Sequence, residues 1–234
     1  ALAPRAPAAL DDGTTTLTLQ GLAAFLRNPV KEFFRHRLQV VFGELAAADD
    51  DDETFAGQGL ERWGWVDEVL QACRRAFGAP LGALPPEPTA EAPAEPIDRF
   101  LRQQLGRLER AGRLPLAGPG RVAQEQLLQV LQPMVEAWRA ALRELPQARD
   151  KLPLRLVHPQ HEDLVLDDWL EGLRSAGGAA APVWIELQAS RLADRGSKKS
   201  GPLPRADKLV AVWVRCLASA ACGCPSDGIV IGEG

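Results

Sequence analysis

The chain is 234 residues long, carries a formal net charge of −4, and is 46% hydrophobic and 25% charged. These values are typical of a globular protein with room for one sizeable domain or two small ones. The acidic balance excludes a domain that coats DNA over its whole surface, although it leaves room for one local basic loop. No apolar run reaches the roughly 18 residues of a membrane span and no signal-peptide pattern opens the chain, so we expect no membrane partner.

The two ends of the sequence suggest a piece of a longer protein. It begins with "ALAPRAPAALDDG", without a methionine, and stops just after a strand-like run. We expect residues 1–14 to be a linker or disordered. Residues 15–234 are expected to form one domain that is truncated at its C-terminus.

Two short helices are expected to meet at a corner within residues 16–42. Proline disrupts a helix interior but suits the first turn of a new helix, so one helix should end before Pro29 and another should begin there. Apolar residues recur at helical spacing on both sides of this break. They are Leu19, Leu22, Phe25 and Leu26 before it, and Val30, Phe33, Phe34, Leu38 and Val41 after it. The simplest interpretation is a helical corner packed on a core.

The next part of the chain is helical, with two polar interruptions. We expect helices over 58–77, 97–111 and 119–145. Candidate core residues are Leu60, Trp63, Val66, Leu70 and Phe77 in the first, and Leu127, Leu128, Leu131, Val135, Trp138 and Leu142 in the third. The acidic run at 49–53 is interpreted as a solvated loop, and the Pro/Ala/Glu-rich stretch at 79–96 as a mobile linker.

After Pro153 the periodicity changes from helical to strand-like. The stretches "LPLRLVH", "DLVLDDWLEGLRS" and "PVWIELQASRL" combine β-branched and aromatic residues with alternation. In the last of them one face carries Val183, Ile185, Leu187 and Ala189, and the other carries Trp184, Glu186, Gln188 and Ser190. A helix over 206–221 and a strand at "DGIVIG" complete the chain, and the helix has an expected buried stripe of Leu209, Val212, Trp213, Cys216 and Ala220. This order predicts an α/β fold with an N-terminal helical part.

The cysteines and histidines form no metal-site pattern. Cys222 and Cys224 are too close for the CxxC spacing of zinc sites, and no second pair completes four ligands. We expect free thiols and a cytoplasmic location. His158 and His161 have neither a helix nor a cysteine pair beside them, so we predict no metal ligands and no cofactor in this domain.

Four stretches, in chain order, resemble one known family. The most specific is "TLTLQGLAAFLRNPVKEFFRHRLQVVF", which is similar to the start of the C-terminal domain of RecC, the gamma subunit of exodeoxyribonuclease V. Later parts of the same domain resemble "FAGQGLERW" at 55–63, "LERAGRLPLAGPGRVAQEQL" at 108–127 and "RADKLVAVWVRCLASAACG" at 205–223.

This resemblance implies both a fold and an assembly. The fold would be a degenerate member of the PD-(D/E)xK nucleases, an α/β fold with a mixed sheet, and the helical corner would be its structural entry. The assembly would be RecBCD, a helicase and nuclease that processes double-strand DNA ends for recombinational repair. The implied partners are RecB-like and RecD-like subunits, DNA ends and forked DNA. ATP and Mg²⁺ are expected for the partner subunits, and the cleaving centre for RecB.

The residues themselves indicate whether nuclease chemistry is retained. An active site of this fold needs an acid on one strand, and an acid and a lysine two residues apart on the next strand, so that they share a face around Mg²⁺. None of the five lysines of the chain has an acid two residues before it. On "VWIELQASRL" the pair would be Glu186 with Gln188, or Gln188 with Ser190, and Glu171 could stand for the first acid. We therefore predict no catalytic and no metal-binding residue.

The best candidate for contact with DNA is the segment 191–208, "RLADRGSKKSGPLPRADK". Its basic residues are Arg191, Arg195, Lys198, Lys199, Arg205 and Lys208. Six basic residues minus two acids, Asp194 and Asp207, leave a local charge of +4 in a chain of −4. These charges would hold phosphates without reading the base sequence, unless the segment is only a solvated surface loop.

The hypothesis that follows is a non-catalytic domain that helps to part and guide DNA strands and contacts the other subunits. Two alternatives stay open. One is an active metal-dependent nuclease in which a lysine such as Lys198 has migrated, and the other is a module that only docks subunits.

Overall fold

The computed structural model describes residues 15–40, 59–78, 97–115, 117–178, 181–194 and 203–234. Its elements in chain order are β1 (Thr15–Leu17), α1 (Leu19–Arg27), α2 (Pro29–Arg37), α3 (Gly59–Phe77), α4 (Ile97–Arg110), α5 (Ala117–Glu144), β2 (Gln147–Ala148), β3 (Leu152–His158), β4 (His161–Leu170), β5 (Leu173–Ser175), β6 (Val183–Arg191), β7 (Ala193–Asp194), β8 (Leu203–Pro204), α6 (Ala206–Ala221) and β9 (Asp227–Glu233). The linkers expected at 1–14 and 79–96 and the acidic run at 49–53 lie outside the described residues.

The strands form three sheets, two of which contain both parallel and antiparallel pairs. The largest has the order β2-β5-β6-β9, the second the order β1-β4-β3, and β7 pairs only with β8. β6 and β9 run parallel and are joined through helix α6, whereas β5 pairs with β6 antiparallel. The expected α/β fold with a mixed sheet is confirmed. The strand β1 was not expected; it precedes the helical part and pairs parallel with β4.

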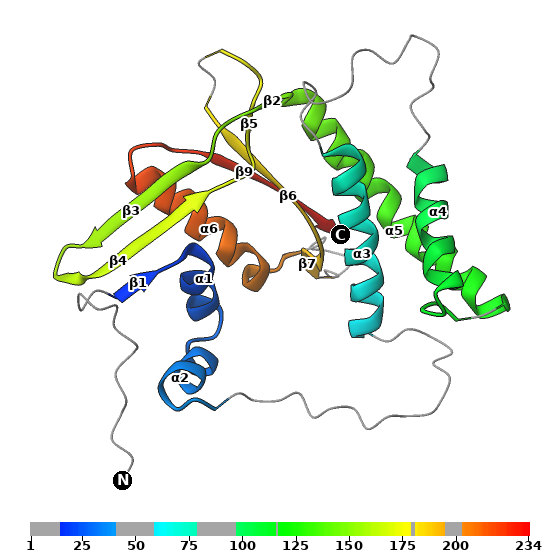
Figure 1. The fold of residues 1–234 in the computed structure, drawn as a ribbon, viewed down its shortest axis with the longest axis horizontal. Helices are drawn as coiled ribbons and strands as arrows, with labels where there is room; N and C mark the ends of the chain where they lie inside the picture. Colours follow the sequence, from blue (N-terminus) through cyan, green and yellow to red (C-terminus); the bar gives the residue numbers. More distant parts are fainter. Residues whose placement is uncertain (1–14, 41–58, 79–96, 116, 179–180, 195–202) are drawn as a thin grey trace.

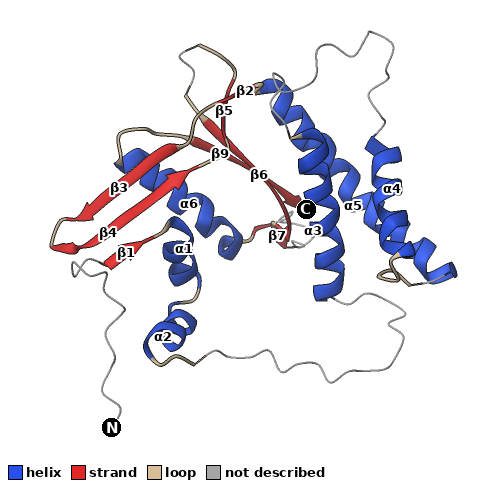
Figure 2. Cartoon of the chain, viewed as in Figure 1, coloured by secondary structure: helices blue, strands red, loops and turns tan. Residues whose placement is uncertain are grey.

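Helices cover both faces of β6 and β9 (Figures 1 and 2). One face meets α3 and α5, against which α4 packs in turn, and Leu187 and Ala189 of β6 belong to this core. The other face meets α1 and α6, and Trp184 of β6 is buried in this second core. The alternation expected along β6 therefore divides its residues between two cores. Expected core residues that are buried in the structure are Val66, Leu70, Leu127, Leu128, Leu131, Val135 and Trp138.

The corner between α1 and α2 forms where proline predicted it. The side-chain oxygen of Asn28 accepts a hydrogen bond from the backbone nitrogen of Lys31 at 2.9 Å, which caps α2. Pro29 occupies the first turn of α2, where the backbone nitrogen of any residue would lack a partner within the helix.

The apolar face of α2, however, is not packed on a core. Val30 and Phe33 are 63% and 52% exposed, and α2 contains no buried residue. Figure 1 shows α2 at the edge of the molecule, beyond α1 and away from the sheets. Helical spacing of apolar residues predicts a helix with an apolar face, but it does not determine what that face contacts.

The buried faces of α3 and α6 are rotated from the expected stripes. In α3, Leu60 and Trp63 are exposed, whereas Trp65 is buried. In α6, Trp213 is 65% exposed, whereas Val214 is buried. Both helices carry more apolar residues than one stripe holds, so the packing partner rather than the period selects the buried face. None of the helices in the described ranges is long and apolar enough to cross a membrane.

Candidate functional site

Strand β6 (Val183–Arg191) contains the residues to which the sequence analysis assigned the acid and lysine positions of the resembled nucleases. Glu186 lies two residues after the buried Trp184, on the side of the strand that faces α6. Arg215 of α6 donates a hydrogen bond from Nη1 to the carboxylate of Glu186. The same guanidinium lies 5.0 Å from the centre of the Trp184 ring. Trp184, Glu186 and Arg215 therefore form one contact group between β6 and α6.

This arrangement changes what the carboxylate of Glu186 can do. Its charge is already balanced by a charge-assisted bond to Arg215, and the side chains of the two residues are only 35% and 34% exposed. A divalent cation at this carboxylate would have to displace the guanidinium or bind beside it, against its positive charge. The acid on β6 thus stabilises the packing of α6 on the sheet.

The remaining motif positions on β6 are neutral. Gln188 and Ser190 are both partly buried, and they lie where the regular pairing of β6 with β9 is interrupted, between Leu187 and Arg191. Neither side chain supplies the negative charge or the ammonium group that the nuclease chemistry requires.

The first acid of the motif is also isolated. Glu171 is exposed between β4 and β5, next to Gly172, whose φ of +72° lets the chain turn there. Asp168 on β4 is engaged elsewhere: its Oδ2 accepts a hydrogen bond from the backbone nitrogen of Leu19 at 2.8 Å, which holds the start of α1 on the strand. Across the described ranges, no group of three or more His, Cys, Asp or Glu side chains is placed to hold a metal ion.

The basic segment is divided between described and undescribed residues. Arg195, Lys198 and Lys199 lie outside the described residues. The ends of the segment are joined, because Ala193 pairs with Pro204 in the two-stranded β7–β8 sheet. The residues that flank 195–202 are therefore held in a two-stranded sheet.

Arg191, the first basic residue of the segment, is bound to an acid. Its Nη2 lies 3.1 Å from Oε1 of Glu233 on β9, and Nη1 of Arg62 on α3 lies 2.8 Å from Oε2 of the same carboxylate. Burial by itself raises the pKa of Glu233, but the hydrogen bonds from Arg62 and Arg191 outweigh it, so the pKa is lowered overall. This cluster ties α3 to the ends of β6 and β9.

The last basic residues of the segment are also close to acids. Arg205 lies 3.3 Å from Asp207 and 3.8 Å from Asp194, and Lys208 lies 3.9 Å from Asp207. Together with the Arg191 pair, these contacts reduce the local positive charge that the described part of the segment offers to a phosphate.

Sequence reasoning missed the residues that complete these clusters. Arg215 was expected only as part of an amphipathic helix, and Arg62 and Glu233 had no assigned role. Arg62 and Glu233 are 171 positions apart in the chain. The one local signal was an arginine among the apolar residues of α6, and it does not identify Glu186 as its partner.

The fold and these contacts define the class of protein: an α/β domain in which a β6-α6-β9 unit is covered by a helical layer. A comparison with family models then identifies the family. The model of the RecC C-terminal domain matches residues 14–230, nearly the whole chain, and the chain belongs to this family. The family resemblance found in the sequence is thereby confirmed. A search of the curated proteins gives no match.

Proposed function

We propose that this chain is a catalytically silent, DNA-handling domain of an exodeoxyribonuclease V gamma subunit. Membership of the RecC C-terminal domain family supports a role in the RecBCD complex. The proposed lack of nuclease activity rests on the contact between Glu186 and Arg215, together with the neutral residues Gln188 and Ser190. In this proposal the cytoplasmic partners, RecB-like and RecD-like subunits, supply ATP hydrolysis and cleavage.

The nuclease-like ancestry implied by the resemblance is part of the same proposal. A mixed sheet covered by helices on both faces is compatible with it. Such a fold would keep a shape suited to a DNA fork after losing its metal ligands, and it would help to part the duplex and guide the strands.

The proposed lack of nuclease activity is tested by incubating the chain with linear duplex and single-stranded DNA in Mg²⁺ or Mn²⁺. We expect no degradation, because the strand that should hold the acid and lysine has neither in the required spacing. Degradation that persists in the Glu171→Ala and Glu186→Ala variants would come from a contaminating nuclease. Degradation that either substitution abolishes would contradict the proposal.

Contact with DNA is tested separately, in the assembled complex. If Lys198 and Lys199 touch phosphates, a Lys198→Glu, Lys199→Glu variant should weaken forked-DNA binding. It should also flatten the salt dependence of binding by roughly 0.7–0.9 log unit for each phosphate that is no longer neutralised. The matched control reverses two exposed charges on α4 and α5, Arg99→Glu and Arg143→Glu. Equal salt slopes in the wild type and the lysine variant would exclude this segment as the DNA contact.

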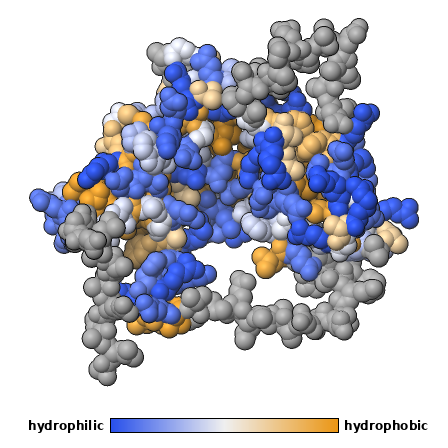
Figure 3. Space-filling model, viewed as in Figure 1, coloured by the Kyte–Doolittle hydropathy of each residue, from blue (hydrophilic) through white to orange (hydrophobic). Residues whose placement is uncertain are grey.

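A second candidate function, subunit docking, is favoured by the exposed apolar face of α2. Figure 3 shows apolar surface on the lower side of this helix, and Val30 and Phe33 of α2 are each more than half exposed. Large exposed apolar groups of this kind mark protein interfaces more often than DNA contacts. A Val30→Asp, Phe33→Asp variant should then fail to copurify with the partner subunits, whereas Val122→Asp, at an exposed position of α5, should copurify normally.

A further inference from the structure

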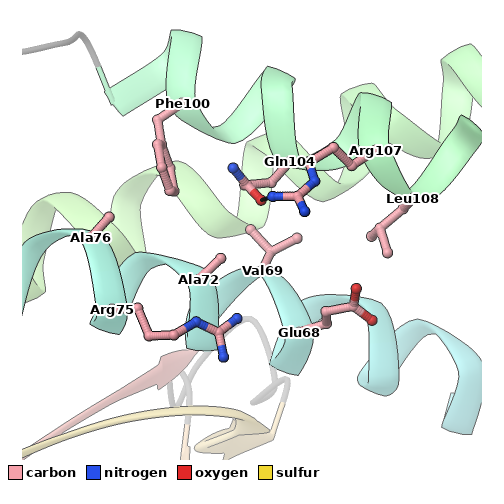
Figure 4. A pocket seen from close by; sticks show the side chains of 9 residues that line it. All are labelled: Glu68, Val69, Ala72, Arg75, Ala76, Phe100, Gln104, Arg107 and Leu108. Carbon is pink, nitrogen blue, oxygen red and sulfur yellow. Dashed lines mark hydrogen bonds between the residues drawn. The ribbon is translucent and has the colours of Figure 1, made fainter. Parts of the chain in front are cut away.

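Helices α3 and α4 leave a groove between them (Figure 4). Its volume is about 370 Å³, within the range of ligand-binding pockets. The apolar side chains that line it are Val69, Ala72, Ala76, Phe100 and Leu108. Val69 and Leu108 are almost fully buried, so the apolar surface that a side chain from another molecule could cover belongs to Ala72, Ala76 and Phe100.

Two guanidinium groups border this apolar surface from opposite helices. Arg75 of α3 and Arg107 of α4 both line the groove; the guanidinium of Arg107 lies between the two helices beside Gln104, whereas the side chain of Arg75 extends along α3 (Figure 4). Arg107 donates a hydrogen bond to the side-chain oxygen of Gln104 at 3.4 Å, and within the described ranges neither arginine forms an ion pair. Glu68, the acid among the described lining residues, is bound to Arg113. The groove thus carries two positive charges that its own acid does not balance.

The combination of charge and apolar lining determines the class of ligand. Arginine binds carboxylates through paired N–H donors, and a desolvated apolar side chain gains free energy in the neighbouring groove. A DNA backbone would use the two charges but not Ala72, Ala76 and Phe100. We infer that the groove binds a polypeptide segment from outside residues 1–234 in which an Asp or Glu stands next to an apolar residue. This inference does not depend on the proposed handling of DNA.

Site-specific photocrosslinking in the assembled complex tests the inference. Gln104, at the rim of the groove, is replaced by p-benzoylphenylalanine, and the crosslinked peptide is identified by mass spectrometry. The matched control carries the same photoreactive residue at Gln71, an exposed position of α3 that does not line the groove. We expect Gln104 alone to give a crosslink to an acidic, apolar peptide from another domain or subunit.

Charge reversal then tests the role of the two arginines. An Arg75→Glu, Arg107→Glu variant should lower the crosslink yield by roughly tenfold, because two attractive contacts become repulsive. Arg99→Glu, on the same helix α4 but outside the groove, should leave the yield unchanged. If the double reversal lowers the melting temperature, an Arg75→Gln, Arg107→Gln variant replaces it and should still lower the yield.

Four results would overturn the inference. They are a crosslink to DNA, a crosslink to residues within 1–234, a yield from Gln104 no higher than from Gln71, and a yield that both arginine variants leave unchanged. Fork binding is measured on the same samples, so that a failure of this inference is distinguished from a failure of the DNA-handling proposal.

Discussion

Replacing Gly228 with alanine should destabilise the domain, because this glycine lies directly against Trp184. The two residues are paired across β9 and β6. A Cβ atom at Gly228 would lie 2.1 Å from Cζ2 and 2.4 Å from Cε2 of the indole, far inside van der Waals contact. Trp184 is 2% exposed and packs beneath Arg215, so its ring has little room to move away.

The size of the effect follows from two opposing contributions. Overpacking a core by one methyl group costs roughly 1–3 kcal/mol, and the severe overlap places Gly228→Ala near the upper end. Removing a glycine from a strand recovers roughly 0.5–1 kcal/mol of chain entropy. The expected net loss is about 2 kcal/mol, which corresponds to a fall of roughly 4–8 °C in the melting temperature of a domain of this size.

Urea and thermal unfolding of the wild type and four variants measure this loss of stability: Gly228→Ala, Gly64→Ala, Trp184→Leu, and Trp184→Leu combined with Gly228→Ala. Gly64→Ala is the matched control, because a Cβ atom at this α3 position meets nothing within 4 Å, and alanine there should stabilise the helix by up to about 1 kcal/mol. In a Trp184→Leu background the overlap is removed, so adding Gly228→Ala should cost much less than in the wild type. The reasoning is refuted if Gly228→Ala is as harmless as Gly64→Ala, or if its cost is the same in both backgrounds.

Two further predictions concern ionisable groups. Burial raises the pKa of Cys73 to about 12, and the nearby Arg74 opposes this shift. In the folded chain at pH 8, Cys73 should therefore resist a thiol reagent, whereas the exposed Cys224 should react. Equal reaction rates would show that Cys73 is accessible. The pKa of Glu233 is lowered below its ordinary value of 4.5, so its contribution to stability is present at neutral pH and is lost as the pH falls through the folded-state pKa. The difference in urea midpoint between the wild type and Glu233→Gln should therefore shrink between pH 7 and pH 3, and a difference that stays constant would contradict the assigned ion pairs.

The sequence predicts those features of the fold that depend on near neighbours. The corner at Asn28-Pro29 follows from the backbone of proline, and the alternation along β6 follows from strand geometry. Which face of α6 is buried depends instead on the position of β6 and α1: Trp213, which was expected to be buried, is exposed, and Val214, which was not in the expected stripe, is buried. Period alone cannot distinguish neighbouring apolar stripes on one helix.

The candidate site shows the same limit. The lack of an acid and lysine at the required spacing around Glu186 was visible in the sequence, since it is a question of spacing along one strand. The partner of Glu186 was not visible in the sequence, because Arg215 lies 29 positions later in the chain, on α6, and approaches Glu186 only when this helix packs on the sheet. Likewise, the basic character of the segment that begins at Arg191 was correct by composition, but its pairing with Glu233 depends on the register of β6 with β9.

Mn²⁺ binding, followed by electron paramagnetic resonance, tests most directly whether the β6 face lacks the metal site that a nuclease would need. The chain is titrated against a fixed concentration of Mn²⁺, and the signal of the free ion is recorded for the wild type, Glu186→Gln and Arg215→Ala. Because Arg215 balances the Glu186 carboxylate and no second described acid joins it, we expect the three titrations to coincide, with no stoichiometric site. A one-to-one site in the wild type that is lost in Glu186→Gln would contradict the proposal and would support an active metal-dependent nuclease instead.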